Sequence, residues 1–404
     1  MPIRVVHSVY RWLEQTETWL YNQVRFLPPD IEAHIVTDDV TNVDQFPAQH
    51  IHAATSLSWP RRAWGRALRR LRIRRHMGHL LPTIQAQGAS VVHSHFGPLG
   101  WENVRALRQS EARHIVTFYG MDVQYLPQSR PHWYNRYGEL FETVDRVLCE
   151  GPHMAASVVA LGCSRDKVLV HHLGVPVDEI PFSPRRWRRG SPLRVLMAAS
   201  FREKKGIPYG VEALGALARD VPLEVTIIGD ASHQPRCRNE KKRILEALDR
   251  FGLRSKTRLL GYQPHRRLMD EAATHHVFLA PSVTASDGDT EGGAPVCLIE
   301  MIASGMPIVS TRHCDIPAVV RDAQTGFLAE ERDVEGLTER LHHLVREADS
   351  WEDFLRAGRR HVESEFDART QGKRLAKIYR NVAGMAPEEP YHEEHEDIPH
   401  AMTS

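Results

Sequence analysis

The sequence predicts an α/β protein made of two doubly wound, parallel-sheet domains. Its 404 residues exceed what one hydrophobic core usually serves. Short, apolar, β-rich runs alternate with helical stretches, which is the pattern of βαβ units. The alternation occurs twice, before and after a segment rich in proline and arginine. Runs such as "VFLA" at 277–280 are apolar throughout, which suits strands buried on both faces of a sheet.

The expected elements follow in order along the chain. Strands of the first half are expected at 3–10, 33–39, 90–97, 114–120, 145–151 and 167–174. Strands of the second half are expected at 193–200, 223–230, 257–262, 275–282 and 307–311. Helices are expected at 206–220, 240–252 and 336–348. In doubly wound sheets ligands bind at the carboxyl ends of the strands, so the residues just after each strand are the candidates for a site.

Changes in composition divide the chain into four parts. Residues 1–180 form the first expected domain and residues 193–384 the second. Between them, residues 181–192 combine prolines with a run of arginines and predict an interdomain linker, with an ordinary surface loop as the alternative. Residues 385–404 are acidic, rich in histidine and poor in apolar side chains, which predicts disorder. Histidines of that tail are also candidates for weak metal binding.

Composition excludes several classes of protein. The 52 basic and 51 acidic residues nearly cancel, so the net charge does not indicate a class of partner. Nucleic acid is not expected as a partner. The five cysteines show no CxxC spacing, which argues against a disulfide framework or a zinc site and for a reducing, cytoplasmic location. No apolar run has the length of a signal peptide or a membrane span. Peripheral contact with the inner face of the cell membrane stays open.

A glycine-rich loop with two acids raises the main question about function. The strand at 275–282 leads into "DTEGGAPVCLIEMIASG", where Gly292 and Gly293 allow close approach of the backbone to a ligand. Pro295 suits the start of a helix that ends at Gly305, and the free N–H groups of a helix start favour an anion such as a diphosphate.

The acids Glu291 and Glu300 flank that helix start, and a phosphate would repel both carboxylates. Sugar hydroxyls suit them better, because one carboxylate accepts hydrogen bonds from two adjacent hydroxyls. A nucleotide sugar supplies a ribose diol, a diphosphate and sugar hydroxyls together. The alternative from the residues alone is a Rossmann-like strand, loop and helix whose acids lie on the surface.

These residues and several others resemble a known family. "EGGAPVCLIEMIASGMPIVST" and "GFLAEERDVEGL" resemble the C-terminal signature of retaining nucleotide-sugar glycosyltransferases of family four. "REKKGIPYGVEAL" resembles the segment that holds the donor diphosphate. "TETWLYNQVRFL", "VVHSHFGPLG" and "TFYGMDV" resemble the colanic-acid, exopolysaccharide branch. The resemblance covers most of the chain and implies the GT-B fold, with two Rossmann-like domains that face a central cleft.

The resemblance implies roles for the residues of the acidic loop. Glu300 would bind the ribose hydroxyls and Glu291 the donor sugar. Eight residues separate these glutamates where the family usually has seven, which leaves the placement of Glu291 open. The stretch formed by Gly292, Gly293, Ala294 and Pro295 would offer backbone N–H groups or shape near the donor.

The resemblance also implies a basic site for the diphosphate. Lys205, followed by Gly206, matches the family lysine. The usual arginine position holds Ser200, and Arg202 stands two residues later. Arg202 either reaches the diphosphate, for which its planar guanidinium is well suited, or lies on the surface.

In the N-terminal half, the resemblance places further candidates after strands. Tyr119 stands where relatives often have histidine, and it donates a hydrogen bond but is a poor base. His95 is expected to contact sugar or acceptor, with a satisfied structural histidine as the alternative. Asp122 is a candidate catalytic base, with a structural loop acid as the alternative. The acceptor or phosphate region is assigned to Thr16, Glu17, Thr18 and Gly97.

The mechanism expected from the family retains the anomeric configuration. Lys205, Arg202 and the helix start would stabilise the departing diphosphate, and the acceptor hydroxyl would attack on the same face. Asp287 and Asp289 form a DGD stretch that suggests a metal, but the family offsets diphosphate charge with basic groups. No essential metal, other cofactor or covalent intermediate is therefore expected.

An arginine-rich stretch at 59–82 predicts a basic helix with one apolar stripe. Such a helix favours an anionic membrane surface, where lipid-linked acceptors lie. A solvated helix packed on the first domain is the alternative, and nucleic-acid binding is the weakest of the three hypotheses because no further basic domain accompanies it.

The expected function is sugar transfer from a nucleotide-diphosphate sugar to a saccharide or lipid-linked saccharide in exopolysaccharide or cell-surface glycan biosynthesis. A GT-B sugar-nucleotide epimerase and a non-catalytic GT-B module that binds sugar nucleotides remain as alternatives.

Overall fold

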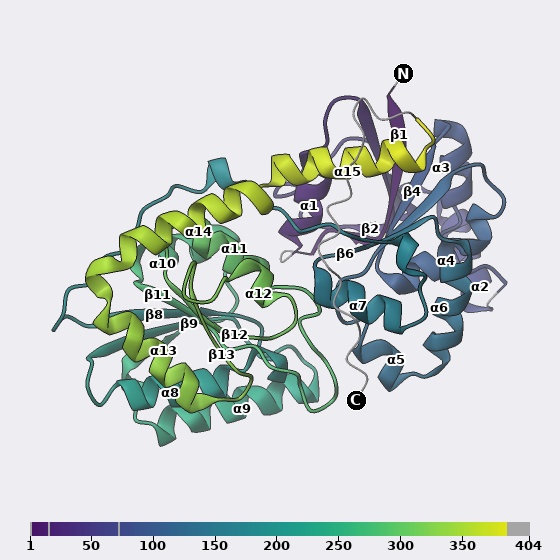
Figure 1. The fold of residues 1–404 in the computed structure, drawn as a ribbon. Helices are drawn as coiled ribbons and strands as arrows, with labels where there is room; N and C mark the ends of the chain where they lie inside the picture. Colours follow the sequence, from purple (N-terminus) through teal and green to yellow (C-terminus); the bar gives the residue numbers. More distant parts are fainter. Residues whose placement is uncertain (1, 15–16, 72, 386–404) are drawn as a thin grey trace. The chain divides into compact units, whose positions relative to one another are not determined.

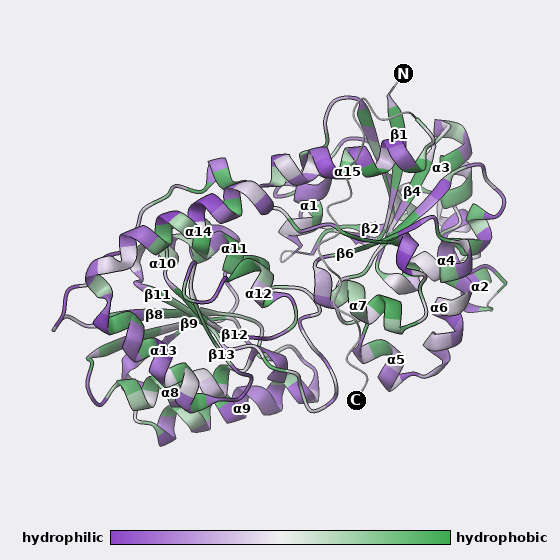
Figure 2. Cartoon of the chain, viewed as in Figure 1, coloured by the Kyte–Doolittle hydropathy of each residue, from purple (hydrophilic) through white to green (hydrophobic). Residues whose placement is uncertain are grey.

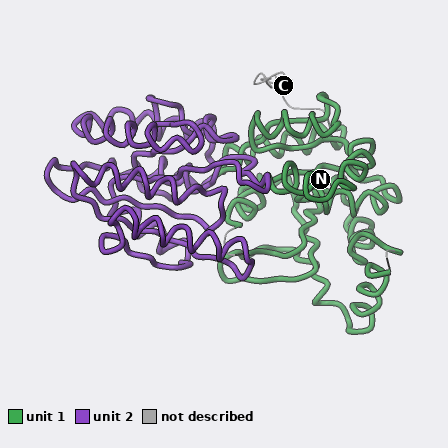
Figure 3. Tube along the Cα trace, turned by 90° about the horizontal axis from the view of Figure 1, so that it is seen from below, with its two compact units in different colours: residues 1–174, 368–404 green, residues 175–367 purple. Residues whose placement is uncertain are grey.

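The chain divides into two compact units (Figure 3). Unit 1 contains residues 1–174 and 368–404, and unit 2 contains residues 175–367. This computed structural model describes residues 2–14, 17–71 and 73–385. No helix among these residues is both long and apolar enough to cross a lipid bilayer.

Unit 1 is built on a seven-stranded parallel sheet (Figure 1). Its strands are β1 (Ile3–Trp12), β2 (Ile31–Val40), β3 (Ile51–Ala53), β4 (Val91–His95), β5 (Arg113–Thr117), β6 (Arg146–Cys149) and β7 (Val168–Val170). Its helices are α1 (Thr18–Arg25), α2 (Trp59–Arg70), α3 (Leu80–Gln87), α4 (Gly97–Leu107), α5 (Tyr125–Ser129), α6 (His132–Thr143), α7 (Pro152–Ala160) and α15 (Ala368–Val382). The strand order is β3-β2-β1-β4-β5-β6-β7.

Unit 2 repeats this architecture with a six-stranded parallel sheet. Its strands are β8 (Leu193–Ala198), β9 (Leu223–Ile228), β10 (Thr257–Leu259), β11 (Val277–Ala280), β12 (Ile308–Thr311) and β13 (Phe327–Ala329). Its helices are α8 (Ile207–Leu217), α9 (Pro235–Arg250), α10 (His265–Thr274), α11 (Val296–Ala303), α12 (Ile316–Val319), α13 (Val334–Arg346) and α14 (Trp351–Glu365). The strand order is β10-β9-β8-β11-β12-β13.

Both sheets reverse their strand order at the corresponding point. The chain runs outward through β1, β2 and β3, then returns to place β4 on the other side of β1. In unit 2, β11 likewise pairs with β8 after the outward run to β10. Ligands of doubly wound sheets bind at this reversal, outside the carboxyl ends of the strands. The loops after β1, β4, β8 and β11 are therefore the places to look for a site.

The central strands are buried on both faces, as their apolar runs predict. In β8, Val195 and Met197 contribute to one hydrophobic cluster of unit 2, and Leu196 contributes to the cluster on the opposite face. Figure 2 shows hydrophobic strands at the centre of each unit and hydrophilic residues on the outer sides of the helices. All eleven predicted strands are confirmed. The edge strands β3 and β13 were not predicted, although β7 and β10, which were, have the same length of three residues.

The structure divides the chain differently from the sequence prediction, which ended the second domain at residue 384. Helix α15 belongs to unit 1, where Leu375 and Tyr379 share a hydrophobic cluster with Val5 of β1. Figure 1 shows this helix beside β1 and α1. An amphipathic helix shows that one face is buried but not which sheet it covers, which is why sequence alone assigned α15 to the neighbouring domain.

The predicted linker, residues 181–192, is packed within unit 2. Arg185 is buried there and donates to the carbonyl oxygens of Ala272 and Ser304 at 3.0 and 3.1 Å. Trp187 contributes to the hydrophobic core. Of the predicted disordered segment 385–404, residues 386–404 lie outside the described residues.

The arginine-rich stretch 59–82 does not form one helix. Helix α2 ends at Arg70, and α3 begins at Leu80. Pro82 lies in the first turn of α3, where its missing N–H costs least, so a helix running unbroken through it is disfavoured. Met77, between the two helices, is buried in the hydrophobic cluster that contains Leu80. The alternative of a solvated helix packed on the first domain is met in part: α2 contains no fully buried residue, but Leu68 is half-buried and Arg69 forms an ion pair with Asp38 of β2 at 2.5 Å.

Gly372 allows α15 to approach α1 closely, which predicts an unusual response to alanine. A Cβ atom on Gly372 would lie 2.1 Å from the carbonyl oxygen of Phe26. We expect Gly372→Ala to lower the free energy of unfolding by about 1–3 kcal/mol, the usual cost of overpacking, despite alanine's better helix propensity. Urea unfolding measures the change.

Gly138 in α6 is the matched control, because no atom lies within 4 Å of a Cβ atom built there. Gly138→Ala should raise the free energy of unfolding by up to about 1 kcal/mol. Equal effects of the two substitutions would contradict the proposed close approach.

Candidate functional site

Two loops of unit 2 interlock at the point where the strand order reverses. The loop after β8 ends at Gly206, which has a left-handed backbone with φ +60°. A Cβ atom at this position would lie 1.8 Å from the carbonyl oxygen of Pro281, in the loop after β11. The Val283 N–H also donates to the Lys204 carbonyl at 2.8 Å. Glycine is thus required at 206 both by its conformation and by the contact it permits.

The interlock brings the two best sequence candidates together. Lys205 Nζ donates to Glu291 Oε2 at 2.7 Å, and Ser282 Oγ donates to Glu291 Oε1 at 2.8 Å. Burial alone raises the pKa of the Glu291 carboxyl, but the ammonium groups of Lys205 and Lys204 lower it to about 2. Glu291 is therefore an anion at neutral pH, fixed at both oxygens.

A second ion-pair group lies beside this one. Lys204 Nζ is 3.3 Å from Asp289 Oδ1 and donates to the Thr290 carbonyl at 2.6 Å. Arg202 forms an ion pair with the other oxygen of Asp289. The Arg202 N–H donates to the carbonyl oxygen of Ser200 at 2.8 Å. The two candidate positions for the family arginine, 200 and 202, therefore lie in one turn. Arg202 belongs to this cluster and is not an isolated surface residue.

The backbone N–H of Glu291 is held by a histidine that sequence reasoning missed. It donates to His313 Nε2 at 3.0 Å, and His313 Nδ1 is 2.6 Å from Glu331 Oε1. Since Nε2 accepts, the ring proton is on Nδ1 and points to Glu331. Burial alone raises the pKa of Glu331, but the hydrogen bond from His313 lowers it to about 2. Glu331 also accepts from the Thr284 N–H at 2.7 Å.

Glu300 is buried on α11 and also has a partner that was not predicted. His265, at the start of α10, lies 2.8 Å from Glu300 Oε1 through its Nε2. This hydrogen bond raises the pKa of His265. A polar pair with one buried and one exposed side chain is therefore available to hydroxyl groups of a ligand.

The glycine-rich loop precedes α11 as predicted, with one difference in detail. Gly292 adopts φ +79°, and Gly293 and Ala294 follow it. Pro295 stands at the N-cap position and Val296 is the first helical residue, so the proline precedes the helix and does not begin it. The helix ends at Ala303, and Gly305, which has φ +80°, follows the C-cap residue Ser304. A cavity of about 20 Å³ lies among these loops and is lined in part by Lys205, Ser282, Pro295 and Cys297.

The DGD stretch places its two carboxylates on separate basic partners. Asp287 accepts from Arg236 at 2.9 Å, whereas Asp289 pairs with Arg202 and Lys204. Asp287 also accepts from the backbone N–H of Asp289 at 3.1 Å. Both acids thus have cationic side chains as neighbours.

In unit 1, two predicted residues meet at the carboxyl ends of β4 and β5. His95 Nδ1 lies 2.6 Å from the Tyr119 hydroxyl, and His95 Nε2 lies 3.0 Å from His7 Nδ1. The ring of Tyr119 packs 4.2 Å from that of Trp19 and 4.8 Å from that of Phe96. Burial raises the pKa of Tyr119 and lowers that of His95, so a neutral phenol faces a neutral imidazole.

Asp122 has the geometry of a loop acid. Its two oxygens accept from the backbone N–H groups of Gly97 and Tyr119 at 2.8 and 3.0 Å. Burial raises the pKa of Asp122, and the hydrogen bonds from these N–H groups act in the opposite direction. The resulting pKa is about 6. Asp122 thereby fixes the start of α4 against the turn that presents Tyr119.

The remaining candidates lie near α1. Glu17 precedes this helix and accepts from the Glu14 N–H at 3.0 Å, and burial raises its pKa. Thr18 is the first residue of the helix and is half-buried. Thr16 lies outside the described residues.

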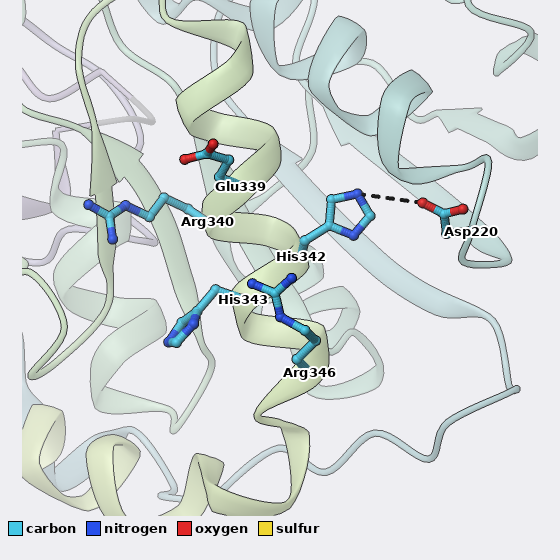
Figure 4. A pocket seen from close by; sticks show the side chains of 6 residues that line it. All are labelled: Asp220, Glu339, Arg340, His342, His343 and Arg346. Carbon is cyan, nitrogen blue, oxygen red and sulfur yellow. Dashed lines mark ion pairs between the residues drawn. The ribbon is translucent and has the colours of Figure 1, made fainter.

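A larger hollow of about 580 Å³ lies beside α13 (Figure 4). It is lined by Asp220, Glu339, Arg340, His342, His343 and Arg346. The His342 ring points toward Asp220, with 3.7 Å between the charged atoms. This hollow contains none of the predicted site residues, and Asp220, which lines it, precedes the amino end of β9.

The comparisons with known sequences match both halves of the chain. The family profile described as Glycosyltransferase Family 4 matches residues 16–179, and that described as Glycosyl transferases group 1 matches residues 192–347. The colanic acid biosynthesis glycosyltransferase WcaL of Escherichia coli (strain K12) is 30% identical over 295 residues, which is 72% of this chain and 70% of WcaL. The amylovoran biosynthesis glycosyltransferase AmsK of Erwinia amylovora is 30% identical over 75% of this chain and 74% of AmsK.

Solved structures share the fold at much lower identity. A glycosyltransferase from Rickettsia africae ESF-5 matches with a TM-score of 0.73 and 17% identity, covering 94% of this chain and 98% of that one. HepE of Anabaena, solved in complex with UDP-glucose, matches with a TM-score of 0.74 and 13% identity, covering 94% and 100%. The predicted GT-B fold class is confirmed.

The low pKa values of Glu291 and Glu331 predict how the stability of the fold depends on pH. In the unfolded chain a glutamate titrates near a pKa of about 4.3, but Glu291 and Glu331 titrate near 2 when folded. Their stabilisation is therefore present above the unfolded pKa and is lost as the pH falls toward 2. Glu291→Gln should reduce the fall of the urea midpoint between about pH 5 and pH 3.

Glu246→Gln is the control for this experiment, because Glu246 is exposed and its ion pair with Lys242 is 3.6 Å long. That variant should follow the wild-type pH dependence. An unchanged dependence in Glu291→Gln would contradict the assigned ionisation.

Proposed function

Since this chain belongs to the glycosyltransferases of group 1 and family 4, we propose that it transfers a sugar from a nucleotide-diphosphate sugar to a saccharide or lipid-linked saccharide, with retention of configuration. The process we propose for it is exopolysaccharide or cell-surface glycan biosynthesis. WcaL and AmsK, whose names refer to colanic acid and amylovoran, support this process. The structure of HepE in complex with UDP-glucose supports a nucleotide sugar as the donor of this chain.

One observation supports the donor site above the others: the contact between Lys205 and Glu291 at the strand-order reversal of unit 2. The lysine and glutamate hold each other at 2.7 Å, with Lys205 about a fifth exposed. A diphosphate that enters beside Lys205 meets an ammonium already positioned for it. Glu291 then remains as an acceptor for hydroxyls of the sugar.

Other candidate residues of unit 2 are proposed to bind the remaining parts of the donor. Glu300, beside His265, accepts from the ribose hydroxyls. Gly292, Gly293 and Ala294 present backbone N–H groups near the start of α11, where the helix dipole favours negative charge. Arg202 adds a second cation that is shared with Asp289.

The transfer step follows from these placements. As the bond to the sugar breaks, negative charge grows on the departing diphosphate, and Lys205 and Arg202 stabilise it. The acceptor hydroxyl attacks the same face of the sugar and gives its proton to the departing phosphate. Glu291 binds the sugar and forms no covalent bond to it. Basic side chains and the helix dipole offset the diphosphate charge in this proposal, without an essential metal.

Tyr119 and His95 of unit 1 are proposed to contact the sugar or the acceptor. The neutral phenol donates a hydrogen bond, and His95, which is held by His7, fixes its orientation. Asp122 supports the turn through backbone contacts and is proposed as a positioning residue.

Nucleotide binding gives the first test. We expect one of UDP, GDP or ADP to raise the thermal midpoint, with a stabilisation of about 2.7 kcal/mol at 100 times its dissociation constant. EDTA should leave the increase unchanged, and Glu300→Ala should abolish it relative to its own unliganded midpoint. Differential scanning fluorimetry measures all three effects.

Glu339→Ala is the control, because Glu339 is exposed and lines the α13 hollow. Loss of the nucleotide effect in this variant, with retention in Glu300→Ala, would overturn the proposed site. Nucleotide binding without any transfer from a matching nucleotide sugar to an acceptor would favour a non-catalytic module.

We propose that α2 brings unit 1 to an anionic membrane surface. Trp59 and Trp64 are 73% and 66% exposed, and Leu71 after the helix is 68% exposed. Arg61, Arg66 and Arg70 are exposed on the same helix. Aromatic side chains with basic residues on a short helix are typical of binding at the lipid headgroup region. Lipid-linked acceptors are found at that surface.

Vesicle sedimentation tests this contact. The protein should bind vesicles containing phosphatidylglycerol and bind weakly to pure phosphatidylcholine, and about 0.5 M salt should weaken the binding. Replacement of Trp59 and Trp64 by alanine should release most of the protein. Tyr262→Ala is the control, because Tyr262 is 54% exposed in unit 2. Equal binding to both vesicles would contradict the proposal.

A further inference from the structure

Two clusters of side chains in unit 1 have the composition of metal sites. Within the described part of the chain, ligand atoms lie within 4.8 Å of one another in one group of three histidines and in one group of a glutamate and two histidines. The histidine group, His7, His93 and His95, is fully buried. His93 uses both ring nitrogens on the hydroxyls of Tyr379 and Thr117, at 2.7 and 2.6 Å. That group is a hydrogen-bonded network within the site described above.

The second cluster consists of Glu32, His34 and His50 and has a different character. Glu32 and His34 are two residues apart on β2, so their side chains leave the same face of the sheet. Strand β3 is the edge strand, and Ile51 at its start pairs with Ile35. His50 therefore lies beside His34, and the two rings are 4.8 Å apart.

The distances in this cluster suit a small divalent ion. His34 Nε2 lies 3.0 Å from Glu32 Oε1. Zinc binds nitrogen and oxygen at about 2.0–2.2 Å, which puts the ligand atoms of a tetrahedral site roughly 3.3 Å apart. Two of the three ligands thus already have the required separation. His50 is exposed, and among the described residues its ring makes no hydrogen bond, so it is free to turn toward them.

Neighbouring residues already orient the two inner ligands. His34 Nδ1 lies 3.2 Å from His52 Nε2, so His34 can donate its ring proton to His52 and leave Nε2 to bind the ion. Arg4 donates to Glu32 Oε2 at 3.2 Å and to the Gln87 carbonyl at 2.9 Å, which fixes the carboxylate and leaves Oε1 available. Such outer partners are the usual support of metal ligands.

We propose that Glu32, His34 and His50 bind one divalent transition-metal ion of the zinc class. Two imidazoles and a carboxylate are a ligand set that zinc accepts, with solvent completing the coordination on the exposed side. The site lies near the amino end of β2, whereas His95 and Tyr119 follow the carboxyl ends of their strands. The ion therefore fastens the edge strand β3 to β2 and takes no part in sugar transfer.

Zinc titration of the full chain tests the site. The tail histidines His392, His395 and His400, outside the described residues, are first replaced by asparagine so that they do not contribute. Calorimetry should then show one zinc ion bound per chain, with a rise of several degrees in the thermal midpoint. His50→Gln and Glu32→Gln should each weaken binding at least about tenfold, because each removes one of three ligands. Both side chains are partly or fully exposed, so these variants should fold.

His233→Gln is the matched control, since His233 is exposed in unit 2 and outside the cluster. It should bind zinc like the parent. Co²⁺ in place of zinc should give visible absorption bands that disappear in His50→Gln. Absence of zinc binding in the parent, or binding unchanged in both His50→Gln and Glu32→Gln, would overturn the proposal. Sugar transfer that depends on His50 would overturn the structural role of the ion.

Discussion

The arrangement of unit 2 depends on the absence of a side chain at residue 206. Gly206 lets the loop after β8 lie against the carbonyl of Pro281 in the loop after β11, at a distance that no Cβ atom would tolerate. Only with this contact does Lys205 reach Glu291 and Lys204 reach Asp289. Since β8 and β11 adjoin at the reversal of strand order, the contact also places these charges where a doubly wound sheet exposes its ligand site.

The charges gathered there are paired within the protein before any ligand binds, with one cation in excess of the carboxylates. Lys204, Lys205 and Arg202 face Asp289 and Glu291, and the last is held further by Ser282 and His313. Burying one of these charges alone would be costly, whereas the paired set is tolerated. In the proposed function, a diphosphate that enters this set would take over contacts made by the carboxylates, and the carboxylates would turn to hydroxyl groups. This proposal accounts for the two acids beside a helix start that favours anions.

The sequence predicted eleven of the strands and singled out Lys205, Glu291 and Glu300 as candidates, because apolar runs and glycine-rich turns are local signals. It did not predict His313, Glu331 or His265, whose partners lie 18 to 35 positions away and meet only through the packing of neighbouring strands and helices. The same reason applies to α15, which covers the sheet of the other half of the chain. The cluster of Glu32, His34 and His50 was not predicted, because β3, whose pairing with β2 brings His50 beside His34, was not among the predicted strands.

Amide hydrogen exchange of the full chain, with and without the nucleotide sugar whose nucleotide gives the largest thermal stabilisation, tests the central claim most directly. The claim is that the donor binds at the loops after β8 and β11. It predicts slower exchange in residues 199–207 and 282–297, including the N–H groups of Gly292, Gly293 and Ala294, with no change along α13. Slower exchange along α13 and near Asp220, with the two loops unchanged, would place the ligand in the other hollow and contradict the account.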